Sequence, residues 1–277
     1  MKNTISSLLL TALCSTSSMA AEAAVDTLIN ETADKATPHF LSAIELANAD
    51  QKNEQNYAAL AQAIGTLGLG KAPDFPAHWI ADDEEAHEHA RPELEERLKM
   101  FAQYDIKLLK ALDVNGDLKT NEAELREGIK NSLLFVLDDK LKVDGDNDKK
   151  LSPKEYALAV PAHDEEKDED GLDWHQRGHF DRDDKNSDGF LDQSEMISFT
   201  AEGVVYRAAL IHSSLVLQGA DTNKDGEISK EEFLVLNPKA EELWKEIVKE
   251  KPSLKLDSAY PSIYWLGMDK LKMITDA

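Results

Sequence analysis

The chain is poor in cysteine, in aromatic residues and in long apolar runs. Its single cysteine, Cys14, excludes a fold held together by disulfide bonds. Aromatic residues make up 6% of the 277 residues, so we expect a modest, aliphatic core, although 42% apolar residues is typical of a globular chain. No apolar run is long enough to span a bilayer.

Basic residues are also few: 31 stand against 54 acidic residues, which gives a formal charge of −23. This balance repels nucleic acid and anionic membrane surfaces, and it attracts divalent cations. The sequence contains no nucleophile elbow, no phosphate-binding loop and no zinc-protease motif. It therefore favours a cation-binding protein that is not an enzyme and has no nucleic-acid partner.

The N-terminus has the pattern of a secretory signal peptide over residues 1–20. Lys2 supplies the positive charge, Ile5 to Leu13 the apolar core, and Ser18 to Ala20 a cleavage site of small residues. Two alternatives remain open, an amphipathic helix of the mature protein and a lipid attachment at Cys14. The signal predicts export and no membrane insertion after its removal: periplasmic or secreted in a bacterium, in the ER lumen or secretory pathway in a eukaryote.

Residues 221–232 carry the most specific pattern in the chain. Side chains with oxygen occupy its first, third, fifth, ninth and twelfth positions, Gly226 the sixth and Ile228 the eighth. Calcium takes six to eight oxygen ligands, and a glycine permits the sharp bend that brings them together. Residues 184–195 match every one of these positions, with Gly189 and Leu191 in the corresponding places. Both segments predict a calcium-binding loop.

Two further segments follow the same spacing less closely. Residues 144–155 have four carboxylates but Lys149 in the glycine position, and we expect this loop to bind metal. Residues 113–124 have Leu118 in the glycine position and Thr120 in the apolar position. Strain at Leu118 is expected to weaken the site by about 1–2 kcal/mol. This segment is either a working loop or a degenerate one.

With these four loops the chain resembles the EF-hand superfamily over about residues 92–237. The resemblance implies an all-α fold of paired helix–loop–helix hands with Ca²⁺ as the bound ion. It implies backbone carbonyl ligands at the seventh positions, and a ligand that usually acts through water at the ninth. The implied metal ligands are Asp184, Asn186, Asp188, Phe190, Asp192 and Glu195; Asp221, Asn223, Asp225, Glu227, Ser229 and Glu232; Asp144, Asp146, Asp148, Lys150 and Glu155; and Asp113, Asn115, Asp117, Lys119 and Glu124.

The outline is similar to the calumenin/reticulocalbin family and to exported bacterial EF-hand proteins. The former has more hands and an ER-retention tail, and neither is found in this sequence. The remaining segments are predicted to be an N-terminal helical region over 21–91, read as short helices, and a C-terminal helical extension over 238–277. The apolar tail of that extension is expected to cover the helix grooves, with partner binding as the alternative.

The acidic stretch from Asp164 to Asp173 is predicted to be a solvated linker that separates the first two loops from the last two. Leu191 and Ile228 are then expected to meet across a short antiparallel bridge.

Two histidine pairs could suggest a transition-metal site. For His87 and His89 an exposed acidic helix face is the preferred interpretation. His175 and His179 are four residues apart, but the sequence shows no third ligand within reach, so we expect them to be structural or exposed.

We therefore predict an exported calcium-binding protein that acts as a buffer or as a calcium-stabilised binding module. The alternatives are a calcium-dependent sensor that binds a protein partner, and an enzyme whose N-terminal helices hold the active site while the hands are structural.

Overall fold

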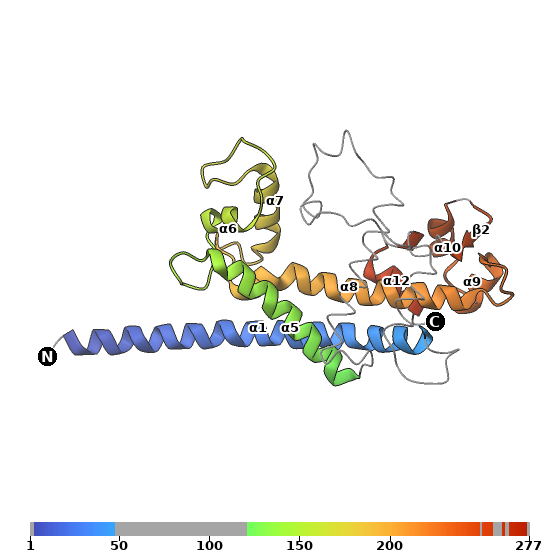
Figure 1. Ribbon diagram of the computed structural model, residues 1–277, viewed down its shortest axis with the longest axis horizontal. Coiled ribbons are helices and arrows are strands. Elements are labelled where there is room, and N and C mark those ends of the chain that lie inside the picture. Colours follow the sequence, from blue (N-terminus) through green and yellow to red (C-terminus); the bar gives the residue numbers. More distant parts are fainter. Residues whose placement is uncertain (1–2, 48–120, 250, 257–261, 264–265, 276–277) are drawn as a thin grey trace. The chain divides into compact units, whose positions relative to one another are not determined.

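The computed structural model describes residues 3–47, 121–249, 251–256, 262–263 and 266–275, with side chains from residue 21 onward. The predicted His87/His89 pair and most of the loop 113–124 lie outside these residues. The regular secondary structure of the described residues is helical apart from two three-residue strands, which confirms the all-α prediction (Figure 1). The elements are α1 (Asn3–Ala47), α5 (Glu122–Lys140), the 3₁₀ turn η2 (Leu141–Val143), α6 (Pro153–Ala159), α7 (Trp174–Asp183), α8 (Gln193–Ala220), β1 (Glu227–Ser229), α9 (Lys230–Leu236), α10 (Glu241–Val248), β2 (Ser253–Lys255) and α12 (Met268–Thr275).

The chain divides into two compact units. Residues 1–32 and 130–203 form the first unit, and residues 33–129 and 204–277 form the second. None of the described helices is long and apolar enough to cross a membrane.

Helix α1 is longer than the sequence analysis expected. Short helices were predicted from residue 21, but one helix runs from Asn3 to Ala47. Its first 35 or so residues contain neither glycine nor proline, so nothing in them interrupts the backbone hydrogen bonds. Pro38 lies within the helix without ending it. Phe40 and Ile44, four residues apart and so on one face of the helix, are both fully buried.

In the first unit two loops lie back to back. The backbone amide and carbonyl of Leu151 bond to the carbonyl and amide of Leu191, with both N···O distances at 2.9 Å. Both leucines are fully buried. Tyr156 of α6 and Phe180 of α7 meet edge to face behind this bridge, with ring centroids 5.4 Å apart. The loops 144–155 and 184–195 therefore form one pair with a common core.

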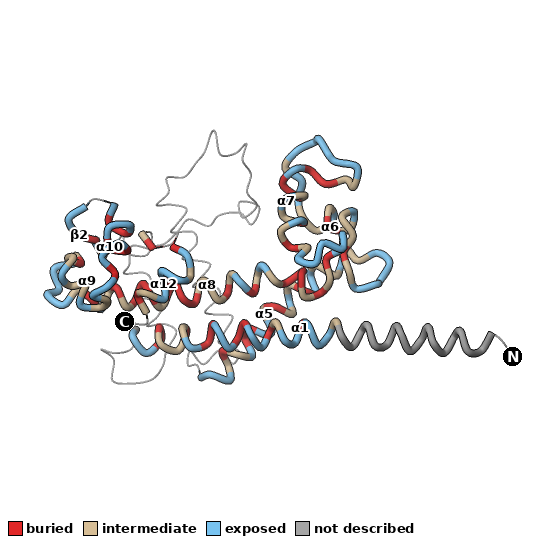
Figure 2. The backbone as a smooth tube through the Cα atoms, turned by 180° about the vertical axis from the view of Figure 1, so that it is seen from behind, coloured by how far each residue is buried: buried red, intermediate tan, exposed pale blue. Residues whose placement is uncertain are grey.

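In the second unit the loop 221–232 has a different partner. Strand β1 pairs antiparallel with β2, so that Ile228 stands opposite Leu254, and both are buried. Phe233 of α9 packs on Trp244 of α10, with ring centroids 5.2 Å apart. Figure 2 shows buried residues along each of these elements.

The C-terminal tail belongs to the core of the second unit. Leu271 and Ile274 of α12 are buried, and the Ser213 hydroxyl donates to the Leu271 carbonyl at 3.3 Å. The amide of Asn237 donates to the carbonyl of Met273 at 3.0 Å. These contacts favour the expected internal cover over an exposed binding segment.

The predicted bridge between Leu191 and Ile228 is wrong, and so is the division into the first two and last two loops. Leu191 pairs with Leu151, and Ile228 pairs with Leu254. A bridge between Leu191 and Ile228 would require the chain to turn back between the loops 184–195 and 221–232. Instead α8 is a single helix of 28 residues, and its one central glycine, Gly203, costs about 1 kcal/mol without breaking it.

Candidate metal centre

Each described loop ends in the capping motif of the helix that follows it. The ninth residue is the N-cap, and the glutamate at the twelfth position returns a hydrogen bond to the N-cap amide. Ser152 and Glu155 form such a box before α6, and Ser229 and Glu232 form one before α9. Asp192 and Glu195 make the same two bonds before α8, at 3.0 and 2.9 Å. The caps hold the glutamates over their loops.

The backbone of the three loops has the same two left-handed residues. Asn147, Ser187 and Lys224 at the fourth position have φ angles of 60°, 57° and 60°. At the sixth position Gly189 and Gly226 have φ angles of 81° and 86°. Lys149 adopts 66° in the same place, which costs a lysine more than a glycine. The loop 144–155 thus has the bend that its sequence made doubtful.

Loop amides point at loop carboxylates in a repeated pattern. The sixth amide donates to the first carboxylate in all three loops: Lys149 to Asp144 at 2.9 Å, Gly189 to Asp184 at 3.0 Å, and Gly226 to Asp221 at 3.0 Å. The seventh amide donates to the fifth carboxylate: Lys150 to Asp148 at 2.8 Å, Phe190 to Asp188 at 3.0 Å, and Glu227 to Asp225 at 2.9 Å. These bonds turn the carboxylates of positions one and five toward the backbone of their own loop.

The donor set fits a hard cation. In the loop 144–155, one oxygen from each of Asp144, Asp146 and Asp148 lies within 4.8 Å of the others. Oδ2 of Asp144 accepts the Lys149 amide, whereas its Oδ1 is buried and has no hydrogen-bond partner among the described residues. A buried carboxylate oxygen without a donor is costly. A cation bound among these carboxylates would remove that cost.

The twelfth-position glutamates differ in their environment. Hydrogen bonds from the amide and the hydroxyl of Ser229 lower the pKa of Glu232 to about 2. Hydrogen bonds from Ser152 likewise lower the pKa of Glu155. Burial instead raises the pKa of Glu195, whose side chain is only 5% exposed. Glu195 therefore has the most to gain from a neutralising cation.

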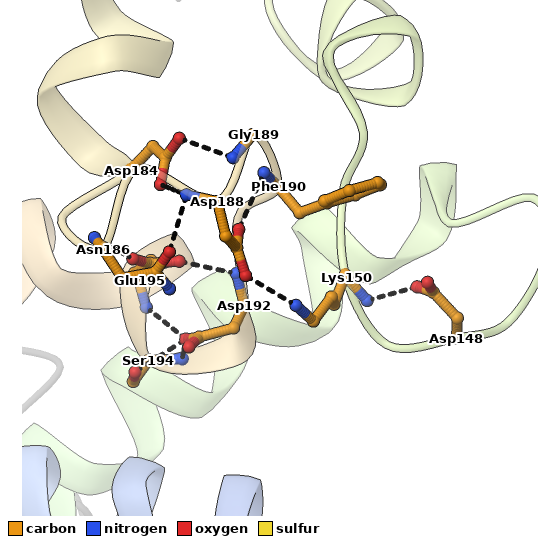
Figure 3. A network of polar contacts seen from close by, with 10 residues as sticks. All are labelled: Asp148, Lys150, Asp184, Asn186, Asp188, Gly189, Phe190, Asp192, Ser194 and Glu195. Atoms are coloured by element: carbon orange, nitrogen blue, oxygen red, sulfur yellow. Dashed lines mark hydrogen bonds and ion pairs between the residues drawn. The ribbon is translucent and has the colours of Figure 1, made fainter.

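A lysine connects the paired loops of the first unit. Lys150 Nζ lies 3.0 Å from Asp188 Oδ2, and it also sits over the ring of Phe190 (Figure 3). Asp188 is the fifth-position carboxylate of the neighbouring loop. The Lys150 ammonium thus offsets the charge of a carboxylate that is a predicted ligand of the loop 184–195, so it would compete with a bound cation there.

Replacing Lys150 with methionine is expected to strengthen Ca²⁺ binding at the loop 184–195. Both partners are about 40% exposed, so the ion pair contributes at most about 1 kcal/mol, or a fivefold change in affinity. Calorimetric titration measures the change. Lys185→Met is the matched control, because it removes the same charge while its Nζ faces Glu202 at 4.0 Å. Equal gains in both variants would show that the contact with Asp188 has no particular effect.

Of the first predicted loop, only the end is described. Asn121 caps α5: Glu124 donates its amide to Asn121 Oδ1 at 3.1 Å, and Asn121 Nδ2 donates to the Glu124 carboxylate at 3.0 Å. Asn121 and Glu124 are the ninth and twelfth residues of the loop 113–124, so the same two positions are in contact as in the other loops. The predicted ligands Asp113, Asn115, Asp117 and Lys119 lie outside the described residues.

The partner of the loop 221–232 was not predicted from the sequence. Because Leu254 faces Ile228, the positions equivalent to one, three and five of a loop fall on Ile247, Lys249 and Lys251. None of these can donate a carboxylate. The sequence does contain a pattern that indicates this strand: Leu254 and Leu256 alternate with polar residues after Pro252. That pattern carries no indication of a metal site.

Comparison with known proteins agrees with this geometry in one segment. Residues 216–236 match the family model described as EF hand. The match covers the last turn of α8, the loop 221–232 and all of α9. Searches among curated proteins and among solved structures return no match. Residues 216–236 are thus similar to an EF hand, a motif that generally binds calcium.

Proposed function

We propose that the chain is an exported, non-enzymatic protein that binds Ca²⁺ in the loops 144–155, 184–195 and 221–232. The observation that supports this most is the repetition of one backbone geometry in all three, with the same two left-handed positions and the same amide-to-carboxylate bonds. The family match covers one of them, and the other two share its geometry.

The proposed ligands are the oxygens at positions one, three, five, seven, nine and twelve. The ion supplies two positive charges where the chain has an excess of negative ones. Residues 138–195 contain 19 acidic and 9 basic residues, a difference of −10. Repulsion of this kind destabilises the compact state, and a bound dication relieves it. Calcium would then stabilise the hands by holding the helices on either side of each loop.

Export agrees with such a role. Extracellular calcium modules commonly bind with dissociation constants of about 10⁻⁴ to 10⁻³ M. In a calcium-rich exterior the loops would be filled continuously, as expected of a calcium-stabilised module. In the lumen of the endoplasmic reticulum, the same affinities would let the chain buffer the Ca²⁺ concentration.

Calorimetric titration of the purified chain with Ca²⁺, and separately with Mg²⁺, tests the proposal. Glu232→Gln and Glu195→Gln are each expected to weaken one class of site at least about tenfold, because each removes a charged oxygen from the closing ligand. Glu242→Gln, which changes an 86% exposed glutamate on α10, is the matched control. Helical content in saturating Ca²⁺ should remain. An unchanged number of sites and unchanged affinity in both loop variants would contradict the proposal.

A further inference from the structure

Three histidines of the first unit lie ring against ring, away from the calcium loops. His175 on α7 has the ring of His163 at a centroid distance of 4.1 Å and the ring of His179 at 4.2 Å. His163 immediately precedes the acidic stretch from Asp164 to Asp173, and His179 lies one turn after His175 on α7. His163 is thus a third histidine beside the pair that the sequence places four residues apart.

The ring of His175, the central histidine, is buried and lacks hydrogen-bond partners among the described residues. His175 is 7% exposed, and neither of its ring nitrogens has a hydrogen-bond partner among the described residues. The buried Nε2 of His163 also lacks such a partner there. A neutral imidazole has one donor and one acceptor nitrogen, and leaving both unpaired in a buried place is costly. Such a group calls for an ion or an ordered water.

The segment before α7 is held so that His163 stays over the helix. Buried Asp173 accepts the amides of His163 and Asp164 on one oxygen, and the amide of Gln176 on the other. The Gln176 side chain donates to the carbonyl of Val160 at 2.6 Å. The predicted solvated linker is in this respect an ordered turn.

Charge at this turn also favours a cation. Arg177 pairs with Asp168 and Asp170, which fixes the far side of the turn. The remaining carboxylates of Asp164 to Asp173 leave the local field negative, and this field attracts a divalent ion.

Imidazole nitrogens select a different class of ion from the loops. They suit zinc, copper and nickel, whereas carboxylate and carbonyl oxygens suit calcium and magnesium. We propose that His163, His175 and His179 bind one divalent transition-metal ion, with water completing its coordination. The calcium loops play no part in this site.

The rings must turn to bind the ion. Among the described residues, only Asp144, Asp146 and Asp148 already bring three ligand atoms of metal-binding side chains within 4.8 Å of one another. A half-turn about χ2 exchanges nitrogen and carbon positions of a histidine while the ring stays in its plane. We expect the ion to select the ring orientations that turn nitrogen atoms of the three histidines toward one another.

Titration of the Ca²⁺-saturated full chain with Zn²⁺ tests the inference, because calcium then blocks the loops. We expect one Zn²⁺ per chain, with shifts of the His163, His175 and His179 ring signals in histidine-selective NMR. The double variant His163→Gln/His179→Gln changes the two partly exposed histidines and should weaken this binding more than about 100-fold, the upper cost of losing an outer-shell partner. His87→Gln/His89→Gln is the matched control and should bind as the unchanged chain does.

Far-UV circular dichroism and Ca²⁺ affinity show whether each variant is folded, and His163→Gln alone serves if the double variant is not. The inference is overturned if Zn²⁺ does not bind in stoichiometric amount, which would leave an ordered water as the partner of His175. It is equally overturned if the control loses Zn²⁺ binding, or if the histidine variants keep it. None of these outcomes bears on calcium, which is measured separately.

Discussion

Leu191→Ala is expected to lower the free energy of unfolding of the first unit by about 2–5 kcal/mol, the usual cost of truncating a buried leucine. Leu191 is fully buried, and its amide and carbonyl both bond to Leu151 in the other loop of the pair. The cavity left by the shorter side chain would weaken the packing of both loops around this bridge. Ca²⁺ affinity should therefore fall at 144–155 and at 184–195 together. Chemical unfolding and calorimetry measure the two effects.

Ile228→Ala is the matched comparison in the second unit. Ile228 is as fully buried, but it faces Leu254, so its truncation should weaken only the loop 221–232. If Leu191→Ala weakened 221–232 and spared 144–155, the bridge between Leu191 and Leu151 would have no energetic role.

Removal of Ca²⁺ is expected to have the second large effect. An ion that binds only the folded state stabilises it by about 2.7 kcal/mol for each site at a hundredfold excess over the dissociation constant. With three filled loops, the free energy of unfolding would rise by this amount for each bound ion. Chelation with EDTA should thus lower the melting temperature markedly, and renewed Ca²⁺ should restore it. Circular dichroism during heating measures both.

The same melting series in Mg²⁺ at equal ionic strength separates binding from charge screening. Magnesium demands a near-octahedral geometry and keeps its waters, so it should restore less stability than calcium. A melting temperature that does not depend on chelation would contradict the proposal that calcium holds these helices.

The sequence predicts the loops well because their chemistry is local. Five oxygen positions, one glycine and one apolar residue within twelve residues specify the turn, and the capping serine or aspartate and the glutamate lie within the same segment. Even Lys149 adopts the left-handed angle, because the surrounding bonds to Asp144 and Asp148 require it.

Partners of the loops could not be predicted in the same way. Which loops pair depends on where the intervening helices end, and α8 continues through Gly203 as one helix. Ile228 is matched by Leu254, a residue in a segment with no metal pattern to reveal it. His163 lies twelve residues from His175, and the bonds of its segment to Asp173 and Gln176 hold it there. These contacts are set by tertiary packing.

The lysines opposite the loop 221–232 have a consequence for the shape of the binding curve. Lys249 and Lys251 stand where a sister hand would hold a second ion, so occupancy of this loop gains nothing from a neighbour's occupancy. Its curve would have a Hill coefficient of one. The two bridged loops of the first unit, by contrast, can fill in concert. A single polypeptide would then respond gradually to calcium at one place and steeply at another.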